Sequence, residues 1–282
     1  MTSFSLARRW RQAGPLPGFG LTLGITLGWL GLIVLLPLLA LLIKAAGLGP
    51  QGWWDIATDP RVLAAMRLSF GTALIAALID TVIGLLIAWV LVRYRFPGRA
   101  ALDALIDLPF ALPTAVAGIA LTAIYAGNGW LGQYLEPLGY KIAYAPAGIV
   151  MALIFIGLPF TVRTVQPVLE NLAAEHEEAA ASLGASRFTT ARRVILPQIL
   201  PAMITGFSLA FARGVGEYGS VIFIAGNLPY VSEIAPLLVV IKLEEFDYHG
   251  ATVIATLMLA ASFAILFLVN KLQRKVARGQ AV

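Results

Sequence analysis

The sequence contains no cysteine, and only 12% of its 282 residues are charged, about half the share of an ordinary soluble domain. Without cysteine the chain can form no disulfide, no thiolate zinc site and no cysteine nucleophile. It has two histidines, and we expect neither a catalytic nor a metal-binding constellation. No stretch fits G-x-x-x-x-G-K-[ST], so the phosphate-binding loop of ATP-hydrolysing proteins is missing. These absences argue against an enzyme with its active site in this chain.

Hydrophobic residues make up 59% of the chain and are gathered into long stretches. A soluble domain of this composition would expose a very apolar surface to water, so a membrane is the simpler environment. Crossing the hydrocarbon layer takes about 20 helical residues, and the stretches lack the alternation of barrel strands. The run 234–241 is too short to span and predicts a surface or re-entrant segment. We therefore predict an all-α membrane protein with six transmembrane helices, at residues 21–43, 68–92, 108–126, 142–162, 198–226 and 250–270.

Lysine and arginine gather between alternate predicted spans. If the N-terminus lies inside, the inner segments contain the basic groups at residues 8–11, 93–99, 163–193 and 271–278. Basic loops stay on the cytoplasmic side of a membrane, so both termini are predicted to be cytoplasmic. This distribution accounts for the net charge of +5, and nucleic acid is not expected as a partner.

One connection, residues 163–197, is longer than the others and lies on the predicted inner side. Its first half is rich in Glu and Ala, which favour helix. Gly184 follows, where a helix end favours a left-handed residue, and Ser186 is a suitable N-cap for a second helix. Pro197 marks the return to the membrane. The pattern predicts a short helix–turn–helix at the cytoplasmic face.

The same loop carries a family motif. Glu-Ala-Ala at 178–180, Gly184, and Val-Ile-Leu-Pro at 194–197 resemble the EAA motif of ABC-importer permeases, with Val194 in place of the usual Ile. In that family the loop forms a coupling helix seated in a cleft of a cytoplasmic ATPase subunit. The resemblance implies that ATP and Mg²⁺ are bound by the partner ATPase and that this chain holds no cofactor. It implies a coupling role for Glu178, Ala179, Ala180, Gly184, Leu196 and Pro197.

Further segments extend the resemblance over nearly the whole chain. They are 93–99 (RYRFPGR), 107–118 (DLPFALPTAVAG), 159–167 (PFTVRTVQP), 216–227 (GEYGSVIFIAGN) and 245–247 (EFD). These segments look like the T-type permease subunits of sulfate/thiosulfate ABC importers. Molybdate and tungstate permeases share the Gly-Glu-aromatic-Gly piece at 216–219 and stay an alternative. The resemblance implies an inner-membrane protein with the type I permease fold and several partners: a second permease subunit in a heterodimer, two ATP-binding subunits and a periplasmic sulfate/thiosulfate-binding protein.

The family fold also predicts how the chain is divided. The permease core is expected at residues 65–270, with the coupling loop 163–197 inside it. The first span and its outer loop, residues 21–64, would lie outside this core, and residues 1–20 and 271–282 would form cytoplasmic ends.

Three ionisable residues fall inside predicted spans: Asp80, Arg213 and Glu217. An ionisable group within a membrane is a functional candidate by default. Arg213 and Glu217 are four residues apart, so they share a helix face and can pair. They form either a structural ion pair, or a pathway site where Arg213 attracts a passing dianion and Glu217 keeps its binding weak. Asp80 is likewise either a buried contact to a neighbouring helix or part of a gate or interface.

Three glycines around this pair, Gly214, Gly216 and Gly219, fit the pattern G-x-G-x-x-G. A dinucleotide site would need a preceding strand and a βαβ unit, whereas this stretch lies in a predicted membrane helix. The glycines instead predict close helix packing, or a helix break that lines a pathway.

An acidic group, Glu244, Glu245 and Asp247, falls on the predicted outer side, as a solvated loop or as a docking surface for an external binding protein. A secondary anion transporter is the rival class, but it predicts inverted repeats, and we find no clear repeat. We therefore expect the non-catalytic permease subunit of an ATP-driven importer for sulfate or thiosulfate.

Overall fold

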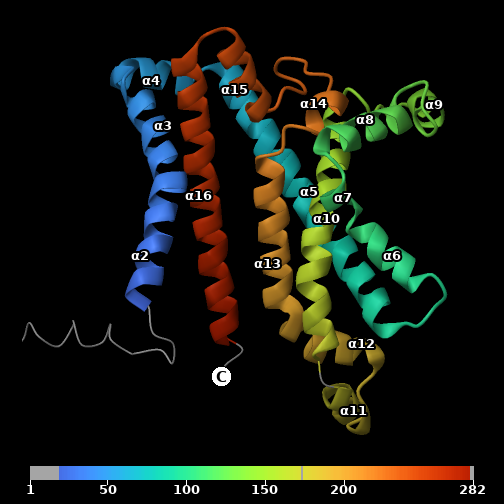
Figure 1. Cartoon of the computed structure of the whole chain (residues 1–282). Coiled ribbons are helices and arrows are strands. Elements are labelled where there is room, and N and C mark those ends of the chain that lie inside the picture. Colours follow the sequence, from blue (N-terminus) through green and yellow to red (C-terminus); the bar gives the residue numbers. More distant parts are fainter. Residues whose placement is uncertain (1–18, 173, 280–282) are drawn as a thin grey trace, which may run out of the picture.

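The computed structural model describes residues 19–172 and 174–279, and these form helices joined by turns and loops, with no strand among them (Figure 1). The predicted all-α fold is therefore confirmed. Five described helices are long and apolar enough to cross a membrane, one fewer than predicted. These five are Phe19–Ala46, Pro60–Arg93, Pro146–Glu170, Arg187–Val215 and Tyr248–Lys271.

The described helices follow one another along the chain. The segments η1 and η3 are π-helical turns inside longer helices, and η2 is a 3₁₀ turn. In chain order they are α2 (Phe19–Leu30), η1 (Gly31–Leu35), α3 (Leu36–Ala46), α4 (Gly49–Ala57), α5 (Pro60–Arg93), α6 (Arg99–Ile106), α7 (Leu108–Ala111), α8 (Thr114–Tyr125), α9 (Gly132–Leu135), η2 (Glu136–Leu138), α10 (Pro146–Glu170), α11 (Ala174–Ser182), α12 (Arg187–Thr190), η3 (Ala191–Ile195), α13 (Leu196–Val215), α14 (Val221–Ile224), α15 (Ala235–Glu244) and α16 (Tyr248–Gly279).

Three long helices, α5, α10 and α13, form the centre of the fold (Figure 1). Small residues let their backbones approach closely. A Cβ atom built on Gly84 of α5 would lie 2.7 Å from Thr161 Cγ2 of α10, and one built on Gly206 of α13 would lie 2.9 Å from Thr161 Cα. Thr161 itself is fully buried. The three helices therefore meet at glycine-lined crossings.

The first long helix, α2–η1–α3, is joined to the rest through α16 and α4 (Figure 1). Its large apolar side chains are exposed, with Leu21 at 70%, Leu32 at 62% and Ile43 at 72%. Apolar surface on this scale requires lipid or another protein around it.

The predicted span at 108–126 is wrong as an uninterrupted helix. Helix α7 ends at Ala111, Leu112 is extended, and α8 begins after Pro113. A proline disfavours helical backbone at the residue before it, which accounts for the break. Helix α8 has 12 residues and is about 18 Å long, too short to span. Together α6–α9 lie to one side of α10 (Figure 1).

Other predicted boundaries are also corrected. Helix α10 continues past residue 162, the predicted end of the fourth span, to Glu170, and Val165 and Leu169 in this extension are packed into the core. The run 234–241 lies largely in α15, where Ala235 and Leu238 are fully buried, so it is not a surface segment.

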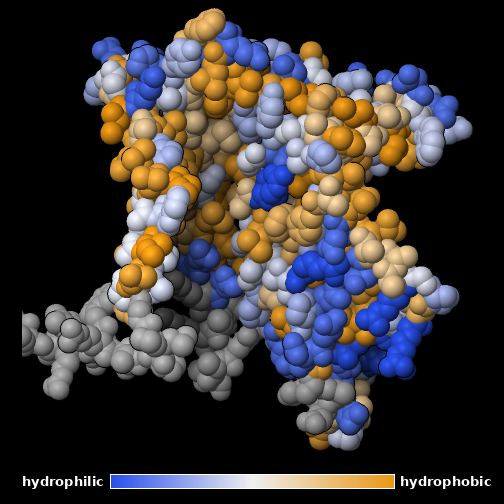
Figure 2. Space-filling model, viewed as in Figure 1, coloured by the Kyte–Doolittle hydropathy of each residue, from blue (hydrophilic) through white to orange (hydrophobic). Residues whose placement is uncertain are grey.

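Hydrophilic residues gather near α6 and α11 and apolar residues over the middle of the molecule (Figure 2).

The first described residues of α2 and the last turn of α16 lie at the same end of the molecule as α11 and α12 (Figure 1). The predicted cytoplasmic termini themselves, residues 1–18 and 280–282, lie outside the described residues.

Candidate functional site

The clearest polar feature within the predicted spans is the end of α13. Arg213 lies in its last turn, and its guanidinium forms an ion pair with Glu217, two residues beyond the helix. The other oxygen of Glu217 accepts hydrogen bonds from the backbone N–H and the hydroxyl of Ser220, both at 2.9 Å. Glu217 is almost fully buried, whereas a third of the Arg213 side chain is exposed. The predicted pairing is confirmed.

The predicted helix through residue 226 is wrong, because α13 stops at Val215. Glycines at 214 and 216 weaken a helix, and the Glu217 carboxylate caps the backbone N–H of Ser220, an alternative to helical hydrogen bonding. Residues 216–220 therefore form a non-helical connection to α14.

Two segments of the family resemblance meet at this connection. Gly118 of α8 lies against Ser220, where an added Cβ would be 2.8 Å from Ser220 Cα. One built on Gly219 would be 3.1 Å from Thr114 Cβ. A Cβ built on Gly214 would lie 3.4 Å from Ala73 Cβ of α5, whereas Gly216 has open space around its Cβ position. The glycines allow α8 to pack directly onto the broken segment.

Asp80 lies elsewhere, at the crossing of α5, α10 and α13. It is 1% exposed, and a Cβ on Gly157 would overlap its Oδ2, with Ala210 on the third helix nearby. Neither carboxyl oxygen has a hydrogen-bond partner among the described residues. The same is true of the buried Thr161 hydroxyl. The structure therefore pairs Arg213 with Glu217 and leaves Asp80 outside that pair.

The inner loop forms the expected turn. Gly184 has φ +78°, and the N–H groups of Gly184 and Ala185 donate to the carbonyls of Ala181 and Ala180 at 2.9 and 3.0 Å. This is the Schellman arrangement that ends a helix. Ser186 caps α12 by accepting from the Thr189 N–H. The predicted left-handed Gly184 and N-cap Ser186 are confirmed.

The predicted coupling residues occupy two places. Glu178, Ala179 and Gly184 are exposed and Ala180 is buried at the turn, whereas Leu196 and Pro197 begin α13, beyond η3. Two apolar side chains beside the turn, Leu183 at 87% and Phe188 at 75%, are strongly exposed. Sequence reasoning did not single them out, although Leu183 directly precedes Gly184.

Two arginines attach the inner segments to the core. Arg93 at the end of α5 forms an ion pair with Glu177 of α11. Arg163 of α10 binds Asp107 through two hydrogen bonds of 2.8 and 2.6 Å and Asp103 through another of 2.6 Å. These pairs join residues 56 to 84 positions apart, so no local pattern indicated them.

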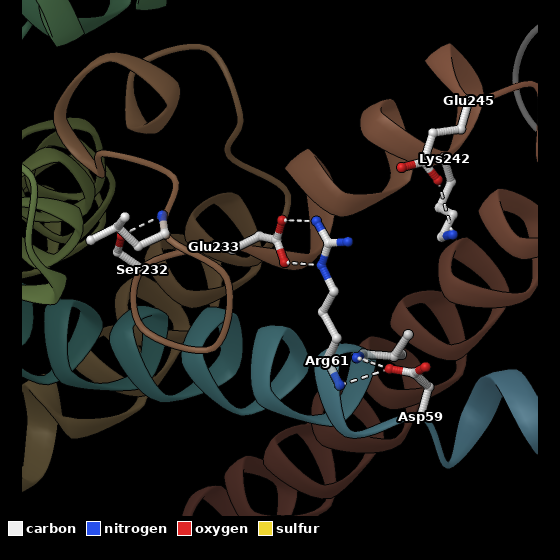
Figure 3. Close-up of polar contacts among 8 residues, drawn as sticks. Asp59, Arg61, Ser232, Glu233, Lys242 and Glu245 are labelled. Carbon is white, nitrogen blue, oxygen red and sulfur yellow. Dashed lines mark hydrogen bonds and ion pairs between the residues drawn. The ribbon is translucent and has the colours of Figure 1, made fainter.

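Another polar cluster (Figure 3) lies around α15, at the end of the molecule opposite α11 and α12 (Figure 1). Arg61 of α5 donates two hydrogen bonds, of 2.8 and 2.6 Å, to the buried Glu233. On α15, Lys242 pairs with Glu245 at 3.0 Å and with Asp247 at 3.4 Å. The hydrogen bond to Glu245 raises the pKa of the Lys242 ammonium group. Two of the three residues in the predicted acidic group, Glu245 and Asp247, are thus paired with Lys242.

No group of three His, Asp or Glu side chains in the described part of the chain converges as metal ligands would.

Comparison with known proteins gives a consistent picture. The family model described as "binding-protein-dependent transport system inner membrane component" matches residues 80–280. The sulfate transport system permease protein CysT of Salmonella typhimurium is 49% identical over 93% of this chain and 95% of its own length. Its counterpart in Synechocystis is 50% identical over 89% of this chain and 87% of its own.

A solved structure shares the fold at low sequence identity. The bacterial alginate ABC transporter, crystallised in complex with an alginate pentasaccharide-bound periplasmic protein, has a chain that is 15% identical, with a TM-score of 0.76 over 96% of both chains.

Proposed function

Because this chain belongs to the binding-protein-dependent transport system inner membrane components, and within them to the sulfate transport permeases, we propose that it is the permease subunit of an ATP-driven importer of sulfate and thiosulfate. The observation that carries the proposal is 49% identity over 93% of the chain to a sulfate permease. The subunit is a non-catalytic, multi-pass protein of the bacterial inner membrane, and ATP is hydrolysed in a separate chain.

The turn at Gly184 is the proposed contact with the ATPase. Its shape is set by backbone hydrogen bonds, and the exposed Leu183 and Phe188 beside it offer apolar contacts for a cleft. The ion pair between Arg93 and Glu177 would pass a displacement of α11 to α5. In this proposal two ATP-binding subunits hold ATP and Mg²⁺, and this chain holds no cofactor.

The break after α13 is the proposed anion pathway. The partly exposed Arg213 supplies positive charge, and its pairing with Glu217 lowers the affinity so that the anion is released. Ser220 holds Glu217 in place through two hydrogen bonds. A purely structural ion pair is the alternative, and substitution of Arg213 separates the two.

A second permease subunit and a periplasmic sulfate/thiosulfate-binding protein complete the proposed assembly. The exposed hydrophobic faces of α2 and α3 are surfaces that a second subunit or lipid could cover. The cluster around Lys242 and Arg61 is the proposed docking area for the binding protein, because it presents charged groups at the end of the molecule opposite Gly184 (Figures 1 and 3).

Reconstitution tests the substrate. The chain would be assembled with its partner permease, ATPase and binding protein in vesicles, and ATP hydrolysis measured with sulfate, thiosulfate or molybdate. Sulfate and thiosulfate are expected to stimulate hydrolysis, and molybdate is not. Stimulation by molybdate alone would overturn the proposed substrate and favour a molybdate or tungstate permease.

Substitution of Arg213 tests the pathway. We expect Arg213→Gln to lose sulfate uptake while the complex still inserts and assembles. Lys141→Gln, which neutralises an exposed cation in another loop, is the matched control and should transport normally. Normal uptake by Arg213→Gln would leave the ion pair with a structural role only.

A further inference from the structure

An apolar groove lies between the inner end of α5 and the segment that follows the Gly184 turn. It encloses about 480 Å³, within the range of roughly 300–1,000 Å³ typical of small-molecule sites. Its walls are aliphatic and aromatic except for a single cation, Arg192. The lining residues are Leu85, Leu86, Trp89, Phe188, Ala191, Arg192, Ile195, Leu196 and Ile199.

Two residues indicate that the groove lies near the predicted inner boundary of the membrane. Trp89 lies one helical turn before Arg93, whose ion pair with Glu177 attaches α5 to the inner helix α11. Tryptophan is enriched where hydrocarbon meets headgroups. The opposite wall is the start of the helix that continues into α13. An occupant would therefore have its apolar part in the inner leaflet and its polar part beside α12.

The cation on the groove wall has no ion-pair partner among the described residues. Arg192 is exposed and takes part in none of the ion pairs found there. Glu177, an acid of the neighbouring α11, is already paired with Arg93. An anionic group at the mouth would meet free guanidinium donors.

The wall that carries Arg192 is itself irregular. Residues Ala191–Ile195 form the π-helical turn η3, a distortion that is frequent at functional sites. Three residues of this turn, Ala191, Arg192 and Ile195, line the groove. The same irregular turn therefore supplies both apolar wall and cation.

We propose that this groove binds an acyl chain of an anionic phospholipid of the inner leaflet, with the lipid phosphate against Arg192. A water-soluble ligand would find almost no polar partner on these walls. An apolar helix of a neighbouring subunit would bury Arg192 without a partner, which is unfavourable. An anionic lipid satisfies both the apolar walls and the guanidinium.

The site would influence the coupling segment. Phe188 and Ala191 follow the Gly184 turn directly, so a bound lipid would brace α12 and η3 against α5. The proposal concerns the membrane and not the transported anion, and it can fail while the transport function holds.

Photoactivatable lipids test the proposal in the assembled transporter. Nanodiscs would contain phosphatidylglycerol or phosphatidylcholine with a diazirine on the acyl chain, and adducts would be mapped by mass spectrometry. We expect phosphatidylglycerol adducts on the groove peptides to exceed phosphatidylcholine adducts about fivefold, from one favourable cation near the surface. Arg192→Gln should reduce that ratio to about one.

Arg193→Gln is the matched control, because it removes the same charge from the next position, which does not line the groove. It should keep the preference for phosphatidylglycerol. Ala191→Phe, which fills the groove, should reduce adducts of both lipids. Equal labelling by the two lipids in the unaltered protein, or equal ratios in Arg192→Gln and Arg193→Gln, would overturn the proposal. So would cross-links showing a helix of the second permease in the groove.

Discussion

The close approach of the buried Asp80 carboxyl to Gly157 leads to a specific prediction about packing at the centre of the fold. A Cβ atom on Gly157 would overlap Asp80 Oδ2, so Gly157→Ala forces either the side chain or α10 to move. Asp80→Ala removes the obstructing oxygen. The two changes should therefore depend strongly on each other.

The size of this dependence follows from the geometry. Overpacking a close-packed core costs about 1–3 kcal/mol, and alanine gains roughly 1 kcal/mol over glycine within a helix. When Asp80 is already alanine, Gly157→Ala changes stability only through the higher helix propensity of alanine. This propensity term is the same whether or not Asp80 is present, so it cancels in the difference between the two effects of Gly157→Ala. Gly157→Ala should thus be less favourable by about 1–3 kcal/mol when Asp80 is present. Asp80→Ala alone should not destabilise the fold by more than about 1 kcal/mol, because both of its oxygens lack partners.

Equilibrium unfolding in mixed micelles measures the four free energies of this cycle. Additive effects of the two substitutions would refute the steric reasoning. Uptake by the stable Asp80→Ala transporter then separates two roles: normal transport would assign Asp80 to packing alone, whereas lost transport would assign it to the gate.

Three further predictions concern the Gly184 turn and two ion pairs. Gly184→Val should strain the left-handed turn by about 1–2 kcal/mol and reduce the ATPase stimulation that the loaded binding protein produces, whereas Gly184→Asn, which tolerates this backbone, should retain most of it. Arg61→Met should lower the free energy of unfolding by about 2–4 kcal/mol, which is less than for a fully buried pair because the Arg61 side chain is 31% exposed. Adding Glu233→Met should recover most of this loss of stability. A double variant that is no more stable than Arg61→Met would contradict the pairing. Glu177→Gln should change global stability by less than about 1 kcal/mol yet speed amide hydrogen exchange in α11, and unchanged exchange would show that the ion pair with Arg93 does not hold that helix.

Features with a local cause could be predicted from the sequence. The left-handed Gly184 and the cap at Ser186 follow from residue type at a helix boundary, and the structure contains both. The long apolar helices follow from stretches without charge. The pairing of Arg213 with Glu217 is predicted from their four-residue spacing, and the two residues pair although Glu217 lies beyond the end of α13.

Other features could not be predicted from hydropathy and spacing alone. The break at Pro113 could not be predicted with certainty from the proline, because membrane helices tolerate proline when neighbouring groups satisfy the freed backbone. The end of α13 at Val215 depends on how Glu217 bonds to Ser220, and a hydropathy window carries no information on that. Arg61 and Glu233 are separated by 172 positions, so their contact exists only in the folded chain.

The course of α13 has a mechanical consequence. The helix has 20 residues, which makes it a rod about 30 Å long. Its inner end continues from the Gly184 turn through α12 and η3, and its outer end is the break that holds Glu217. A tilt of roughly 10° about the inner end would carry the outer end through about 5 Å, comparable to one helical turn. A small rotation imposed at the Gly184 end could therefore become a displacement large enough to open or close the proposed anion pathway at the Glu217 end.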